Sequence, residues 1–146
     1  PGFRLGVTGT FAHNIAVEPG PGVSLEGFVP DLRSLYREAC FLPCPALGGT
    51  GQPVKIVEAM AHGVPVVALE WAAARSPLVH GVNGLVAHDA REFAEHMVQL
   101  WTDRALCRKL GENARETVAS ECSEQRLHEQ LAQIFSTAET RLSTAP

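Results

Sequence analysis

The sequence lacks the features that mark membrane proteins, nucleic-acid-binding proteins and disordered chains. Its apolar runs are far shorter than the roughly 20 residues that cross a bilayer, and no basic segment with an apolar core opens the chain. The net charge of -4 provides no broad basic surface for nucleic acid. A content of 45% hydrophobic residues disfavours disorder. We therefore expect a soluble, cytoplasmic domain that binds neither nucleic acid nor the bilayer core.

The cysteines and histidines have no spacing that indicates a metal site or a disulfide framework. Cys40 and Cys44 lie in one apolar run and Cys107 and Cys122 stand alone, so no C-x-x-C pair is present. A thiol in an apolar run usually serves as a small hydrophobic side chain. The histidines are scattered at positions 13, 62, 80, 88, 96 and 128, which does not match a zinc site. We expect structural thiols, no metal and no cofactor.

The order of apolar segments predicts an α/β fold. A chain of 146 residues suffices for one domain and not for two. Short apolar strands alternate with helices, which indicates a parallel sheet covered on both faces. The strands are expected at 3–7, 23–28, 40–44, 65–69 and 84–87, with an irregular segment at 71–83. One domain is thus predicted over 1–146, with an α/β core at 3–88 and three closing helices at 89–142.

The most informative segment runs from residue 48 to residue 68. Gly48, Gly49 and Gly51 allow the backbone to approach a ligand closely. Pro53 suits the first turn of a helix, where its missing N–H is not needed. The first N–H groups of that helix and the positive end of its dipole face the glycine loop. The segment therefore predicts an anion site, and phosphate is its natural ligand.

Two charged side chains interrupt the helix that follows this loop. The neighbours of Glu58 are apolar, so we expect a largely buried helix whose carboxylate needs hydrogen-bond donors. Two adjacent ribose hydroxyls would supply them, but a bond to nearby backbone or a pair with Lys55 explains the spacing equally well. Lys55 lies in the first turn, where a cation is unfavourable unless an anion is in front of it. Alternatively, its stem covers apolar neighbours.

This segment closely resembles the nucleotide-sugar-binding motif of glycosyltransferases with two Rossmann-like domains (the GT-B fold), specifically the retaining group 1 type. In that family a Gly-Thr/Ser-Gly loop leads into Lys-hydrophobic-hydrophobic-Glu-Ala-Met-Ala and then Gly-x-Pro-Val-Val. Residues 49–67 match nearly every position. Other landmarks follow in the family's order at 25–32, 35–36 and 81–86, so the likeness covers roughly residues 3–120.

The resemblance implies a Rossmann-like three-layer sandwich with C-terminal helices, and it implies roles for particular residues. Glu58 would hold the ribose hydroxyls and Lys55 would lie beside the diphosphate, which makes these two the candidate catalytic residues. Phe28 and Val29 would border the nucleobase. An equal alternative is that these residues form the end of a strand and pack in the core. The donor-binding candidates are Gly9, Thr10, Phe28, Val29, Gly49, Thr50, Gly51, Gln52 and Glu58.

The sequence departs from the commoner family pattern in two places, and one further landmark of the family would lie outside this chain. Many relatives carry a second glutamate eight positions before the residue that matches Glu58, and Thr50 brings no charge there. Donor preference is therefore open. Residues 71–75 replace a stretch that usually holds small side chains. The basic pair that holds the leaving diphosphate in the family would lie upstream of Phe3, outside this chain.

The opening of the chain indicates a piece of a longer protein. Pro1 stands in place of an initiator methionine and a strand begins almost at once. The resemblance implies that an N-terminal acceptor-binding domain and the first strand–helix unit of this domain lie upstream. In the family the helical end crosses partly to the other domain, so we expect an exposed apolar face near 127–135.

Two functions follow from these expectations. The first is the donor-binding domain of a retaining, metal-independent glycosyltransferase of carbohydrate biosynthesis, whose isolated fragment turns over little or nothing. Its partners would be a nucleotide-sugar donor and the missing domain, and the full-length protein would associate peripherally with a membrane. The alternative is a non-catalytic nucleotide or sugar-phosphate binding module. A dinucleotide-dependent oxidoreductase is disfavoured because no G-x-G-x-x-G follows the first strand.

Overall fold

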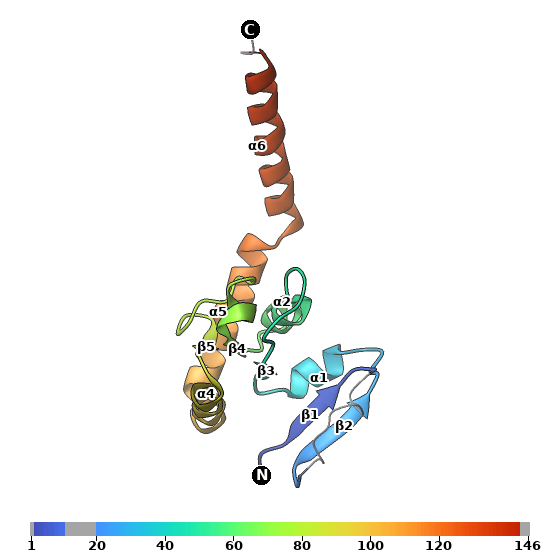
Figure 1. Ribbon diagram of the computed structural model, residues 1–146, viewed down its shortest axis with the longest axis vertical. Coiled ribbons are helices and arrows are strands. Elements are labelled where there is room, and N and C mark those ends of the chain that lie inside the picture. Colours follow the sequence, from blue (N-terminus) through green and yellow to red (C-terminus); the bar gives the residue numbers. More distant parts are fainter. Residues whose placement is uncertain (1, 11–19, 144–146) are drawn as a thin grey trace. The chain divides into compact units, whose positions relative to one another are not determined.

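The computed structural model describes residues 2–10 and 20–143, with side chains described up to residue 137. His13, one of the scattered histidines, lies outside the described residues. The chain divides into two compact units, residues 1–39 and 40–146, and each is described by itself. Figure 1 shows the order of the elements along the chain.

The first unit is built on a pair of parallel strands. β1 (Leu5–Thr8) pairs with β2 (Val23–Gly27), and the register shifts between Val7 and Thr8. α1 (Arg33–Glu38) follows, and the Asp31 carboxylate accepts a hydrogen bond from the Arg33 N–H at 3.0 Å. The two predicted strands are confirmed. The helix begins two residues after Asp31.

The second unit contains a three-stranded parallel sheet with β4 at its centre. β3 (Leu42–Cys44) and β5 (Gly84–Ala87) flank β4 (Val66–Leu69) on either side. All four residues of β4 are buried. A strand covered on both faces requires this continuous apolar run, so the prediction of a buried strand at this position is confirmed.

Helices cover both faces of this sheet. One face of the sheet contributes to the core cluster. There, Val67 and Leu69 of β4 and Leu85 and Ala87 of β5 pack with side chains from α4 (Ala90–Thr102) and α5 (Arg104–Glu121). α2 (Val54–Ala61) contacts β3, β4 and α5. Because successive side chains of a strand point to opposite faces, α2 covers the side to which Val66 and Ala68 point. The predicted α/β class with a parallel sheet and C-terminal helices is thereby confirmed.

The three closing helices predicted over 89–142 are present, and α4 and α5 begin at polar caps. The Asp89 carboxylate accepts from the Glu92 N–H at 2.8 Å, and the Glu92 carboxylate accepts from the His88 N–H at 2.7 Å. This pair of bonds resembles a capping box, except that the second bond reaches the residue before the cap. Asp103 caps α5 in the same way through the Leu106 N–H at 2.9 Å.

The last helix, α6 (Glu124–Ser143), is exposed along its described side chains. Its large apolar residues are 40–65% accessible: Leu127, Leu131, Ile134 and Phe135. The prediction of an exposed apolar face near 127–135 is confirmed. In the part of the chain that the structure describes, no helix is long and apolar enough to cross a membrane.

The segment at 71–83 is more ordered than the sequence predicts. It opens with a single helical turn, α3 (Glu70–Ala73), which is too short to produce a periodic pattern. Asn83 is buried, and its side chain fixes the loop between α3 and β5. Its amide donates to the Pro77 carbonyl at 2.9 Å, and its oxygen accepts from the Val79 N–H at 2.7 Å.

Gly111→Ala is predicted to destabilise the protein by about 1–3 kcal/mol, the usual cost of overpacking. A Cβ at Gly111 in α5 would meet the carbonyl oxygen of Gly63, which follows α2. This backbone cannot move aside as a flexible side chain would, so the clash outweighs the higher helix propensity of alanine. Urea denaturation measures the effect. Glu112→Ala, at the exposed neighbouring position, is the control, and an unchanged or raised midpoint for Gly111→Ala would contradict the packing described.

Thiol labelling is predicted to distinguish the cysteines by burial. Cys122 is exposed, whereas Cys44 and Cys107 are buried. Burial raises the pKa of the Cys107 thiol above its usual 9.0, so little thiolate forms there in the pH range where a free cysteine starts to ionise. We expect iodoacetamide at pH 8 to modify Cys122 first, and Cys44 and Cys107 only after unfolding, as read by peptide mass spectrometry. Equal rates in the native chain would overturn the assignment of these thiols to the core.

Candidate functional site

The glycine loop connects the carboxyl end of β3 to the first turn of α2. Gly49 has a φ of 143° and Gly51 a φ of 76°, conformations that side-chain-bearing residues rarely adopt. Thr50 and Gln52 lie between and beside them, and residues 48–52 are exposed. These backbone conformations favour glycine at positions 49 and 51, and the close approach of a ligand to the loop stays a prediction.

The first turn of α2 has no side-chain cap. Pro53 takes the N-cap position with φ -74° and ψ 93°, so the helix begins one residue later than expected. A proline side chain offers no acceptor, and the Ile56 N–H bonds back to the Pro53 carbonyl at 2.9 Å. The earlier N–H groups of the turn have no partner within a helix. Together with the helix dipole they suit an anion.

The expectation of a largely buried α2 is wrong. The helix buries Ile56, Ala59 and Met60 against the rest of its unit, whereas Lys55 and Glu58 are exposed. The sequence does not show which side of the helix is buried, because Val54 is as apolar as the core residues and yet is 66% accessible. The argument that a buried Glu58 carboxylate needs a ligand to offset desolvation therefore fails. What the structure provides is a cation and a carboxylate on the accessible side of the helix.

The two alternatives for Glu58 are not seen either. Among the described residues, no ion pair joins Glu58 to Lys55, and no backbone N–H bonds to the Glu58 carboxylate. Its backbone carbonyl accepts from the His62 N–H at 3.2 Å, which is helix-end geometry. The carboxylate is open to a ligand.

Trp71 lies against the glycine loop, which the sequence did not predict. A Cβ placed on Gly49 would be 3.2 Å from the Cη2 atom of the Trp71 indole. The Arg75 guanidinium lies 4.5 Å from the centroid of the same ring. The order of the strands could have predicted this contact, because the loop and Trp71 follow the carboxyl ends of the neighbouring parallel strands β3 and β4. Ligands of open α/β sheets bind along that edge.

A further pair at this edge was also missed. Glu70 follows β4 and His88 follows β5, and the Nδ1 atom of His88 lies 2.6 Å from the Glu70 Oε1 atom. Both side chains are well exposed, so the pair is a surface contact of small energy. Across the described ranges, no group of three histidine, cysteine, aspartate or glutamate residues has the arrangement of a metal site.

The remaining donor-binding candidates belong to the first unit. The Gly9 N–H donates to the Gly27 carbonyl at 2.6 Å, so Gly9 and Thr10 lie beside the residues that end β2. Phe28 is 72% exposed and Val29 is half-buried. The alternative of a Phe28 packed in the core is therefore wrong. The structure brings these four residues together within their unit, and it groups the glycine loop with α2 and Trp71 in the other.

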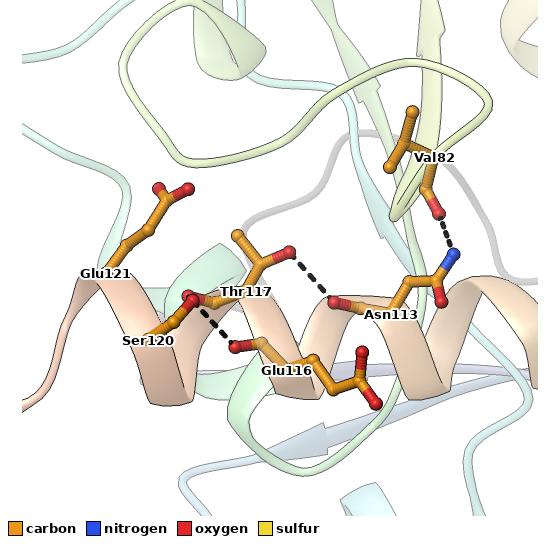
Figure 2. Close-up of a pocket in the computed structure, with 6 residues that line it drawn as sticks. All are labelled: Val82, Asn113, Glu116, Thr117, Ser120 and Glu121. Carbon is orange, nitrogen blue, oxygen red and sulfur yellow. Dashed lines mark hydrogen bonds between the residues drawn. The ribbon is translucent and has the colours of Figure 1, made fainter.

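A surface hollow of about 530 Å³ lies elsewhere in the second unit, and Figure 2 shows the residues that line it: Val82, Asn113, Glu116, Thr117, Ser120 and Glu121. The Asn113 amide donates to the Val82 carbonyl at 2.7 Å, and the Thr117 hydroxyl donates to the Asn113 carbonyl at 2.8 Å. The hollow contains no basic side chain and two carboxylates, so it does not suit a diphosphate. None of the predicted site residues lines it.

Comparison with known proteins finds a family whose model matches most of this chain. A family model described as "Glycosyl transferases group 1" matches residues 4–103. The chain is 32% identical over 116 residues to EpsD of Bacillus subtilis (strain 168), covering 78% of this chain and 30% of EpsD.

Solved structures show the same fold. Sucrose-phosphate synthase from Thermosynechococcus elongatus has a TM-score of 0.70 and 25% identity, with 84% of this chain and 31% of that chain covered. HepE of Anabaena in complex with UDP has a TM-score of 0.70 and 24% identity, with 80% and 32% covered. The chain therefore spans about a third of the length of each of these proteins.

Proposed function

The chain belongs to the group 1 glycosyl transferases, and from this membership we propose that it is the donor-binding domain of a retaining glycosyltransferase. The enzyme transfers a sugar from a nucleotide-diphosphate sugar to an acceptor. The observation that carries the proposal is the uncapped first turn of α2 behind the Gly49 and Gly51 loop, with Lys55 and Glu58 on the accessible side of the same helix. Family membership favours this reading over a non-catalytic nucleotide-binding module.

The proposed donor site binds the diphosphate and the ribose of the nucleotide through different groups. The loop and first-turn N–H groups bind the diphosphate, and the Lys55 ammonium adds a positive charge at the helix end. Charge that develops on the leaving diphosphate is thereby stabilised by fixed dipoles and a cation. The resemblance to the family implies that this happens without a metal ion. Glu58, one turn further along, accepts hydrogen bonds from the two ribose hydroxyls through its two oxygens.

The remaining donor contacts are proposed from the family position of each residue. Thr50 and Gln52 offer uncharged hydrogen-bonding side chains to the sugar or phosphate, and Phe28 offers an exposed aromatic face to the nucleobase. Val29, Gly9 and Thr10 complete the set in the first unit. The complex of HepE with UDP supports uracil as the first base to test.

The acceptor site is proposed to lie in a domain outside this chain. The chain covers 30% of EpsD, which leaves room for an N-terminal domain and for the basic pair that holds the diphosphate in the family. The isolated chain should therefore bind nucleotide weakly and transfer little or no sugar. We place the full-length protein in the cytoplasm, in carbohydrate biosynthesis, with peripheral membrane association.

A nucleotide panel tests the proposed function. Isothermal titration of the 146-residue chain with UDP, GDP, ADP, their sugar conjugates and NAD is expected to show binding of at least one nucleoside diphosphate and none of NAD. The reason is that the loop and helix end provide for a diphosphate, whereas the glycine pattern of a dinucleotide site is absent. Binding of NAD alone, or of no member of the panel, would overturn the proposal.

Glu58→Ala is predicted to weaken nucleotide binding by about 10- to 150-fold, which corresponds to the roughly 1.5–3 kcal/mol of a charged hydrogen bond. The fold should be retained, because the side chain is exposed and makes no contact that holds α2 in place. Calorimetry measures the affinity and the urea midpoint checks the fold. Glu95→Ala, which removes an exposed carboxylate on α4 paired with Arg91, is the matched control. Unchanged nucleotide affinity in Glu58→Ala removes this residue from the site.

A further inference from the structure

Trp71 lies beside the glycine loop of the site. Its Cη2 and Cζ3 atoms would lie 3.2 and 3.8 Å from a Cβ on Gly49. Gly49 adopts a φ of 143°, and Gly51 adopts a positive φ two residues later. Glycine loses more conformational freedom on ordering than any other residue. A glycine-rich loop therefore loses more conformational entropy on ordering than most loops do, and a rigid neighbour reduces the freedom that remains to be lost.

Arg75 holds the indole in place. Its guanidinium lies 4.5 Å from the ring centroid, and its Nη1 atom donates to the Trp71 carbonyl at 3.3 Å. Arg75 is exposed, and no carboxylate of the described residues lies within salt-bridge distance of it. The guanidinium is thus free to stay stacked on the ring, which is the arrangement that cation–π attraction favours.

We propose that Trp71 is a positioning residue of the donor site, whose indole, held by Arg75, fixes the glycine loop in the conformation that binds a nucleoside diphosphate. The inference rests on the proposed function of this loop. Ordering the loop before the ligand arrives lowers the entropy lost on binding, and this is how preorganisation increases affinity. Trp71 acts through the Gly49 backbone, and it is therefore distinct from the groups that bind the diphosphate themselves.

The chain contains a matched control for this contact. Trp101 is the other of its two tryptophans, and Arg104 lies over its ring at the same 4.5 Å. Trp101 packs against the core cluster, whereas Trp71 packs against the loop. Changes at the two tryptophans thus separate the general effect of losing a stacked indole from the effect on the loop.

The first experiment needs no ligand. Nitrogen-15 relaxation of the nucleotide-free chain should show lower backbone order parameters for residues 48–52 in Trp71→Ala than in the native chain. Trp71→Phe, whose ring is shorter than the indole, should fall between the two. Trp101→Phe should leave this segment unchanged. Order parameters in the loop that are equal in Trp71→Ala and the native chain would overturn the inference, whatever the chain binds.

The second experiment uses the nucleoside diphosphate that the native chain binds best, with UDP as the first probe. Trp71→Ala should weaken binding about tenfold, a change of about 1.4 kcal/mol. Trp71→Phe should have an intermediate affinity, and Trp101→Phe should stay near the native affinity. In Trp101→Phe, where Trp71 is the lone tryptophan, the nucleotide should change the fluorescence emission. Lower order parameters in the loop without loss of affinity would overturn the role in binding. If the native chain binds no nucleotide, the proposed function fails, and the role of Trp71 in the donor site fails with it.

Discussion

The burial of β4 on both faces is the constraint on which the second unit depends. Val66, Val67 and Ala68 are fully inaccessible, so helices must cover both sides of the strand, and its neighbours must be parallel to be linked by those helices. Parallel strands end at the same edge. The glycine loop after β3, Trp71 after β4 and His88 after β5 are consequently gathered at one edge of one sheet.

The helix that follows the glycine loop serves two purposes through two different sides. Ile56, Ala59 and Met60 anchor it to the sheet and to α5, and this anchoring fixes the direction of its amino end. Lys55 and Glu58 are on the accessible side and contribute nothing to the core. This separation explains how the helix can carry two charges in an apolar sequence without the desolvation cost of burying them.

The contact between α5 and the turn after α2 shows how the closing helices support the site from a distance. Gly111 lets α5 approach the carbonyl of Gly63, and Gly63 ends the helix that carries Lys55 and Glu58. The polar caps at Asp89 and Asp103 fix where α4 and α5 begin. Packing of α5 against the turn after α2 thus adds to the contacts of Ile56, Ala59 and Met60 that hold α2 in place.

The sequence by itself determined the elements and the motif. Apolar runs located the strands, and the ordered series of residues at 49–67 identified the family. These are local properties of the chain, and local patterns record them. Only the tertiary structure decided that Glu58 is exposed, that Phe28 lies outside the core and that Trp71 contacts Gly49. Each of these depends on which side of an element packs against residues that are distant in sequence. The sequence does not show this, because an apolar residue such as Val54 can be either covered or exposed.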